Sequence, residues 1–148
     1  MILRIIGIFI GILALAVMLE TPRKYVLTAG FIGGVTGFIY LICEHYGNNV
    51  VLASFFSALA AAIVSHIFAR IQKAPVTLFL IAGILPTVPG GGMYRIVANA
   101  IDGNQTATMN SLLETLEIAG AIALAIFFVD AMFRFQNKKT KHAHDHLK

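Results

Sequence analysis

The chain has 148 residues, of which 58% are hydrophobic and only 12% are Asp, Glu, Lys or Arg, whereas a soluble domain has roughly 45–50% apolar and about 25% charged residues. The net charge is +4, and the eleven basic residues are scattered between apolar runs. This composition excludes a soluble enzyme, a disordered chain and a nucleic-acid-binding surface. The single cysteine, Cys43, has no internal partner, which excludes a disulfide-stapled secreted domain.

Long apolar stretches predict membrane-spanning helices. Residues 5–19, 25–43, 45–69, 74–94 and 118–129 contain no Asp, Glu, Lys or Arg, and about 20 apolar residues cross a hydrocarbon core. Backbone groups in lipid need internal partners, and the runs lack the alternation of barrel strands. We therefore expect an all-α membrane protein, a bundle of five helices with one domain at 1–135 and a polar, basic tail at 136–148. The expected spans are about 2–20, 22–43, 49–70, 75–98 and 111–134.

Three of the expected helices have recognisable starting signals. Thr21-Pro22 is typical of an N-cap followed by proline at the first helical position, and Pro75 can open the fourth span in the same way. Ser111 and Glu114 form a capping-box pattern. The last span should therefore begin near Ser111.

The basic residues of the loops predict the orientation. They alternate between rich and poor loops, with clusters at Arg23-Lys24, at Arg70 and Lys73, and in the tail from Arg134. Loops rich in Lys and Arg face the cytoplasm, so we expect the N-terminus outside a prokaryotic cell membrane and the C-terminus inside, with the tail along anionic lipids. Only Arg4 disagrees. It also begins a signal-peptide-like run ending at Ala14-Leu15-Ala16, but cleavage there would leave Arg23 and Lys24 outside.

Small residues recur every four positions on three spans. The pairs are Gly7 and Gly11, Gly30 and Gly34, and Gly33 and Gly37, and the third span carries Ser57, Ala61 and Ser65. Close approach of small residues holds membrane helices together. We expect these faces to be helix–helix contacts; the alternative is that they line a substrate path.

The segment from Pro86 to Gly92 carries most of the functional information. Pro86 and Pro89 lack N–H donors, and Gly90, Gly91 and Gly92 add backbone freedom. A rise of ~1.5 Å per residue from Pro75 puts Pro86 about 16 Å into the membrane. We therefore predict that the fourth helix is broken at Pro86–Gly92 and that these five residues form a substrate-binding and translocation site. The alternative is a structural kink.

Few ionisable residues fall inside the spans. Arg95 either extends to the outer surface or attracts a substrate carboxylate, and Glu117 and His66 are the candidates for proton coupling. Asp130 and Arg134, four residues apart, should pair with each other. His142, His144 and His146 in the tail could hold a metal loosely, although we expect no resident metal or cofactor.

These features resemble the threonine/serine exporter family, specifically its small subunit or C-terminal membrane half. The resemblance rests on Leu85-Pro86-x-Val88-Pro89-Gly90 with Tyr94-Arg95, on Thr21-Pro22-Arg23-Lys24, and on Ala69-Arg70 leading to Ala74-Pro75. Thr87 stands where a Leu is more usual. The resemblance implies export of threonine and serine, or of a dicarboxylate such as succinate, driven by the proton gradient. It also implies a partner, the larger membrane subunit.

Besides a transporter, two other classes of function are a membrane scaffold and an enzyme. A non-transporting scaffold or accessory subunit, whose glycine faces serve assembly into a homo-oligomer or larger complex, is the alternative to a transporter. An enzyme is not expected, because the spans contain no HExxH pair, paired aspartates or Ser–His arrangement.

Overall fold

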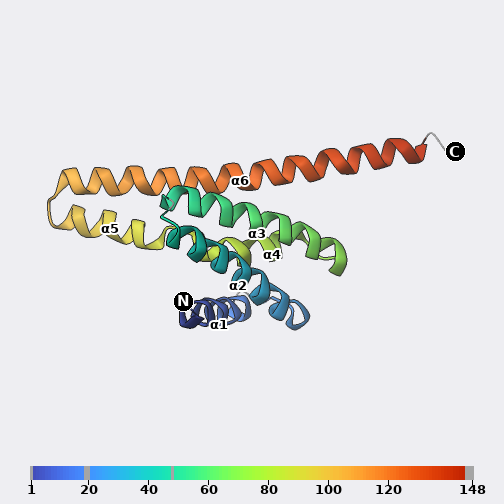
Figure 1. The fold of residues 1–148 in the computed structure, drawn as a ribbon, viewed down its shortest axis with the longest axis horizontal. Coiled ribbons are helices and arrows are strands. Elements are labelled where there is room, and N and C mark those ends of the chain that lie inside the picture. Colours follow the sequence, from blue (N-terminus) through green and yellow to red (C-terminus); the bar gives the residue numbers. More distant parts are fainter. Residues whose placement is uncertain (1, 19–20, 48, 146–148) are drawn as a thin grey trace.

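The computed structural model describes the backbone of residues 2–18, 21–47 and 49–145, and the side chains of residues 6–18, 21–47 and 49–135. Within these ranges the chain is helical and contains no strand. In chain order the elements are α1 (Ile2–Met18), α2 (Arg23–His45), α3 (Val50–Gln72), α4 (Val76–Ile84), the 3-10 turn η1 (Leu85–Thr87), α5 (Gly90–Ile101) and α6 (Gln105–Asp145) (Figure 1). The predicted all-α class is confirmed.

Three helices are long and apolar enough to cross a membrane: α2 and α3, with 23 residues each, and the part of α6 at 105–135. A fourth span requires α4 and η1 to be taken together with α5, which are bent by 52° at the break between them. The predicted interruption of the fourth helix is therefore present. α1 has 17 residues, near the lower limit of about 17–25 for a spanning helix, so a fifth span stays a prediction.

The three helix starts differ from the capping patterns in the sequence. α2 begins at Arg23, with Pro22 rather than Thr21 in the N-cap position, and Pro75 holds the same position before α4; neither start has a side-chain cap. α6 begins at Gln105, six residues before the predicted start at Ser111. The reason is that Asn104 caps this helix, its Oδ1 accepting the N–H of Ala107 at 3.1 Å.

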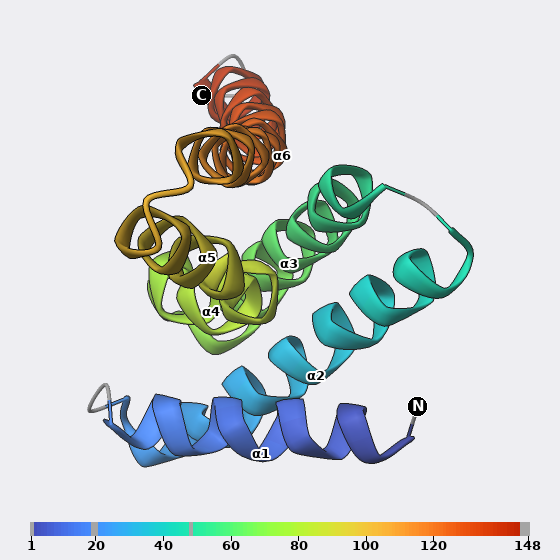
Figure 2. The same cartoon turned by 90° about the vertical axis from the view of Figure 1, so that its left-hand side faces the viewer.

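The centre of the bundle consists of α2, α3 and α4, each in contact with the other two. α1 packs mainly on α2, α6 packs on α3, and α5 pairs with α6 (Figures 1 and 2). Contacts join the start of α2 to the end of α3, where Gln72 Nε2 donates to Thr28 Oγ1 at 2.8 Å, and to α4, where the Tyr25 and Phe79 rings are 5.7 Å apart.

The basic loop residues consequently gather at one end of the bundle. We call it the basic end; it carries Arg23, Lys24, Arg70, Lys73 and Arg134. The opposite end carries the loop after α2 and the turn between α5 and α6. The alternation of charge along the chain thus becomes a separation in space, whereas the side of the membrane that each end faces stays a prediction.

Glycines of α2 let α1 approach closely. A Cβ added at Gly30, Gly33 or Gly37 would lie within 3 Å of Leu13, Ile12 or Ile8 of α1, respectively. On α3, the small residues Ser57, Ala61 and Ser65 are fully buried, as expected for a contact face. The expectation was wrong for Gly7 and Gly11, which have nothing within 4 Å. In this pair of helices the glycines of α2 receive large side chains of α1, and the glycines of α1 face outward.

Replacing Gly33 with Leu should destabilise the bundle. The new side chain would overlap Ile12 and would bring Cβ to 3.1 Å from the carbonyl oxygen of Ala82, and overpacking of this kind costs about 1–3 kcal/mol. We expect a lower midpoint of thermal unfolding, measured by size-exclusion chromatography of the detergent-purified protein. Gly7→Leu is the matched control and should leave the midpoint unchanged. Equal midpoints for the two variants would contradict the α1–α2 contact.

Candidate functional site

The broken helix changes direction over five residues. α4 ends at Ile84, η1 continues to Thr87, Val88 is extended (φ −61°, ψ 127°), and α5 begins at Gly90. Pro89 has φ −78° and ψ 57°, and the Gly90 N–H donates to the Val88 carbonyl at 2.8 Å. This is an inverse γ-turn centred on Pro89, and it accounts for the sharp change of direction.

Each proline removes one helical hydrogen bond. Without an N–H on Pro86, the carbonyl of Ala82 loses its partner four residues along, and Pro89 has the same effect on Leu85. The Leu85 carbonyl is rescued locally by the Val88 N–H at 3.3 Å. The nearby Thr87 side chain is buried, and its hydroxyl donates to the Ile84 carbonyl at 2.6 Å. A Leu at position 87 would lack this bond.

Helix α2 accommodates the remaining carbonyls of the break. The hydroxyl of Thr36 is fully buried and donates to the Gly83 carbonyl at 2.8 Å, with the Gly33 carbonyl as a second acceptor at 3.1 Å. The Ala82 carbonyl oxygen lies 3.1 Å from the place a Cβ of Gly33 would take. Ser57 of α3 donates to the Thr36 carbonyl at 2.8 Å. This side of the break therefore lies against polar groups of α2 and α3 and not only against lipid.

The other side of the break is open at its glycines. Gly90 and Gly91 are exposed and have nothing within 4 Å of an added Cβ, whereas Gly92 is buried directly against the Thr115 hydroxyl of α6. Among the described residues, no backbone acceptor is found for the N–H groups of Gly91 and Gly92 at the start of α5. The break thus combines hydrogen-bonded carbonyls of Gly83, Ile84 and Leu85 on one side with the exposed Gly90 and Gly91 on the other.

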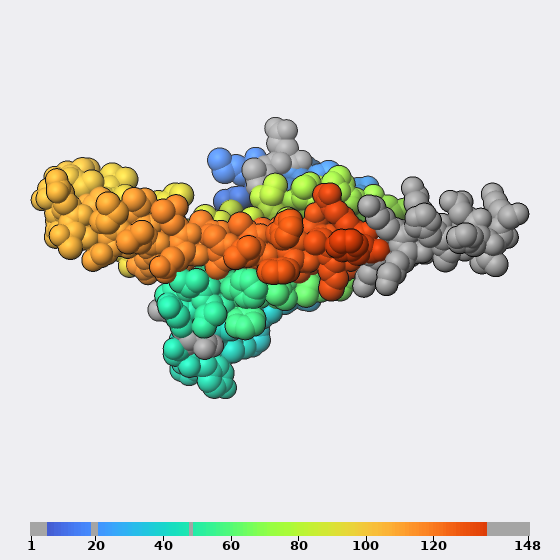
Figure 3. Space-filling view, turned by 90° about the horizontal axis from the view of Figure 1, so that it is seen from above, coloured from blue at the N-terminus to red at the C-terminus, as the bar shows by residue number. Residues whose placement is uncertain are grey.

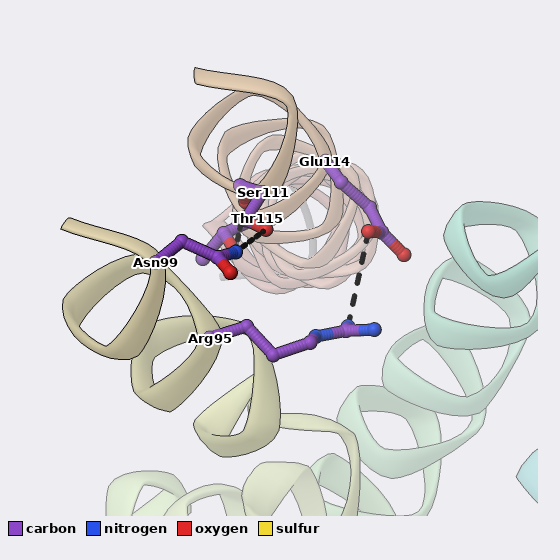
Figure 4. Close-up of polar contacts among 5 residues, drawn as sticks. All are labelled: Arg95, Asn99, Ser111, Glu114 and Thr115. Carbon is purple, nitrogen blue, oxygen red and sulfur yellow. Dashed lines mark hydrogen bonds and ion pairs between the residues drawn. The ribbon is translucent and has the colours of Figure 1, made fainter. Parts of the chain in front are cut away.

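Polar side chains line the seam between α5 and α6 (Figure 4). Arg95 Nη2 lies 3.8 Å from Glu114 Oε2, and Asn99 Nδ2 donates to Ser111 Oγ at 3.3 Å. Thr115 donates to the Ser111 carbonyl at 2.7 Å. Arg95 is therefore directed at a carboxylate of the same protein. A substrate carboxylate would have to compete with Glu114 for it.

The two proton-coupling candidates lie far apart. Glu117 is exposed on α6, just beyond Thr115 and close to the level of Gly92. His66 lies toward the basic end, with Nε2 3.6 Å from Asp130 Oδ1. Thirteen residues separate Glu117 from Asp130 on α6, which is about 20 Å along the axis. The structure thus does not bring Glu117 and His66 into one site.

The surroundings of His66 include contacts that the sequence did not predict. The predicted pair of Asp130 and Arg134 is confirmed, with Arg134 Nε 2.8 Å from Asp130 Oδ2. The contact between His66 and Asp130 was missed, as were the roles of Thr36 and Ser57 beside the break. A useful signal was available for Thr36, because a hydroxyl in the middle of an apolar membrane helix needs a partner.

No metal centre is found in the described part of the chain, where no three His, Cys, Asp or Glu residues come together. The possible metal ligands His142, His144 and His146 lie outside the residues whose side chains are described.

The contact between Gly92 and Thr115 should be sensitive to a single methyl group. Gly92→Ala would push Cβ into the Thr115 hydroxyl, whereas Gly91→Ala adds the same group in open space. We expect Gly92→Ala to lower the unfolding midpoint and Gly91→Ala to leave it unchanged or slightly raised, because alanine favours helix. A midpoint for Gly92→Ala at or above that of Gly91→Ala would contradict this packing.

Comparison with known proteins agrees with these features. The family model described as threonine/serine exporter, ThrE, matches residues 4–132. A protein of Mycobacterium tuberculosis (strain ATCC 25618 / H37Rv), named probable threonine/serine exporter, is 28% identical over 106 residues, which cover 71% of this chain and 19% of that protein. The chain thus spans about a fifth of the length of this relative. No solved structure matches. Because the family match covers most of the sequence, the chain belongs to the threonine/serine exporter family, a family of multi-pass membrane transporters rather than enzymes.

Proposed function

We propose that this chain is a subunit of a secondary transporter that exports a small amino acid such as threonine or serine, or a small dicarboxylate such as succinate. The observation that carries the proposal is the break at Pro86–Gly92, held against α2 by the bond from Thr36 to Gly83. Irregular backbone at membrane depth is tolerated only where protein buries it or where it lines a water-filled cavity. Broken helices of this kind form the substrate sites of many transporters.

The start of α5 supports a role in binding an anionic group. The N–H groups of Gly91 and Gly92 point out of a helix N-terminus, which carries a partial positive charge. Arg95 lies one turn further along and adds a full positive charge. Its Nη2 is 3.8 Å from Glu114 Oε2. We propose that Pro86, Pro89 and the three glycines shape this site, and that Arg95 exchanges Glu114 for the substrate carboxylate.

Coupling to protons is the finer part of the proposal. Glu117 is the candidate at the level of the break, two residues after Thr115, which contacts Gly92; this spacing turns its side chain toward another face of α6. His66 lies at the basic end instead. Under the positive-inside rule, the basic end faces the cytoplasm and the break lies nearer the outer surface of the cell membrane.

A companion protein is supported by the shape of the opposite end. The hairpin of α5 and the first turns of α6 projects past the other helices (Figures 1 and 3). Asn99, Ser111 and Thr115 lie in the seam between its two helices, and large apolar side chains are exposed on it, with Tyr94 75% and Ile101 80% exposed. α2 and α3 have 23 residues each, about 34 Å, against a core of about 30 Å. The hairpin thus projects past helices that already match the hydrocarbon core in length, and we propose that the larger subunit covers its exposed apolar side chains.

Export assays test the transport proposal. Cells without their own exporters are loaded with labelled threonine, serine or succinate, with and without this chain and the larger subunit of the same host. We expect faster efflux only when both proteins are present. Pro89→Ala combined with Gly91→Ala should abolish it while the protein stays in the membrane, because the turn at Pro89 is lost and an added methyl group at Gly91 lies in open space.

Gly120→Ala is the matched control, because Gly120 also has nothing within 4 Å but lies on α6. It should retain efflux. Full efflux in the Pro89 and Gly91 variant would reduce the break to a structural kink. No efflux of any cargo, with both proteins present, would favour the scaffold alternative, which the outward-facing Gly7 and Gly11 support.

The companion surface has its own test. A charge at Val97, which is 58% exposed on the outward face of α5, should prevent the larger subunit from co-purifying. Val97→Lys is compared with Asp102→Lys in the turn at the tip of the hairpin, which should leave co-purification intact. Retention of the larger subunit by Val97→Lys would show that this face is not the interface.

A further inference from the structure

The basic end contains a cleft that the break does not explain. α4 and α6 both pack on α3, and two adjoining hollows of about 280 and 530 Å³ are lined by residues of α3, of α6 and of α4 or its start. Both hollows are lined by His66, Asp130 and Arg134. The larger hollow continues along apolar residues such as Ala62 and Leu80. The cleft thus has a charged mouth and an apolar interior, and its size lies within the usual range of small-molecule sites.

The charged groups at the mouth contact one another and the ring of Phe133. Asp130 contacts Arg134 through Oδ2 at 2.8 Å and His66 through Oδ1 at 3.6 Å. The His66 ring stacks on Phe133, with centroids 4.5 Å apart and planes within 4° of parallel. The Arg70 guanidinium lies 5.1 Å from the centroid of the same phenyl ring. One carboxylate therefore sits beside an imidazole and two guanidinium groups around a single aromatic ring.

We infer that this cleft binds a zwitterionic α-amino acid, with its ammonium group on Asp130 and its carboxylate on Arg134. The inference rests on the proposed export function and adds the site at which cargo is first bound. A zwitterion brings one charge of each sign, so it replaces the Asp130–Arg134 pair by two new pairs and adds no net charge. Paired and hydrogen-bonded charges are the ones that a partly buried site tolerates.

The same arrangement discriminates against a dicarboxylate. Succinate would place one carboxylate near Arg134 and leave the second close to Asp130, and like charges at short range repel strongly in a partly desolvated site. Arg70 and Arg134 could hold both carboxylates only if Asp130 were neutralised. The Thr77 hydroxyl, which lines the larger hollow, offers a partner for the side-chain hydroxyl of threonine or serine. Between the two cargo classes, the cleft thus favours the amino acid.

Binding to the detergent-purified full chain tests the inference. Labelled L-threonine is the probe, and L-threonine amide, 3-hydroxybutyrate and succinate are the competitors; the first lacks the carboxylate and the second lacks the ammonium group. We expect threonine to bind at least tenfold more tightly than each competitor. Asp130→Asn should weaken threonine at least tenfold, because the ammonium group loses its partner, and should leave 3-hydroxybutyrate unchanged or bound more tightly, because Arg134 is released and a like charge is removed.

A structural effect of the substitution would instead weaken both ligands together and would overturn the inference. Asp102→Asn is the matched control, with the same change of charge at the opposite end. Arg134→Gln provides a second variant and should weaken threonine but not L-threonine amide. Unchanged threonine affinity in Asp130→Asn, or tighter binding of succinate than of threonine, would also overturn the inference.

The outcome is separable from the export assay. Threonine binding that depends on Asp130, without any efflux, would leave the cleft assignment standing and remove the proposed function. Efflux of threonine, together with a threonine-binding affinity that does not depend on Asp130, would leave the proposed function standing and remove the cleft assignment.

Discussion

The requirement that every backbone amide in an apolar medium finds a partner governs this structure. Pro86 and Pro89 remove two donors from a membrane helix, and other donors bond carbonyls at the break. The Thr36 hydroxyl donates to the Gly83 carbonyl, and the Ser57 hydroxyl of α3 donates to the Thr36 carbonyl. The Val88 N–H donates to the Leu85 carbonyl. A break of this kind is stable only inside such a framework, which is why α2, α3 and α4 pack as the centre of the bundle.

Gly33 links two of these requirements. Its missing side chain admits Ile12 of α1 and also leaves space for the Ala82 carbonyl of the break. Small residues that hold membrane helices together therefore also shape the functional region. The open glycines on the other side, Gly90 and Gly91, have no such packing role.

The two ends of the bundle differ in their chemistry. The basic end carries a cleft lined by Arg70 and Arg134 and, among the residues whose side chains are described, by one carboxylate, that of Asp130. The opposite end carries the α5–α6 hairpin, which has polar groups in its seam and large exposed apolar side chains such as Tyr94 and Ile101. The charged cleft is the proposed site for a small charged cargo, and the hairpin is the proposed contact for the larger subunit. The break at Pro86–Gly92 lies between them, which agrees with a chain that passes cargo from one end to the other.

The sequence by itself determined the features that depend on local chemistry: the helical membrane class, the interrupted fourth helix and the i,i+4 pair of Asp130 and Arg134. Each follows from composition, from missing donors or from helical spacing. Tertiary structure alone decided which glycines are contacts, placing those of α2 against α1 and leaving Gly7 and Gly11 outside. It also joined His66 to Asp130 and Gly92 to Thr115. These contacts join residues far apart in the chain or depend on which helix face meets a neighbour, and neither is set by the period of a single helix.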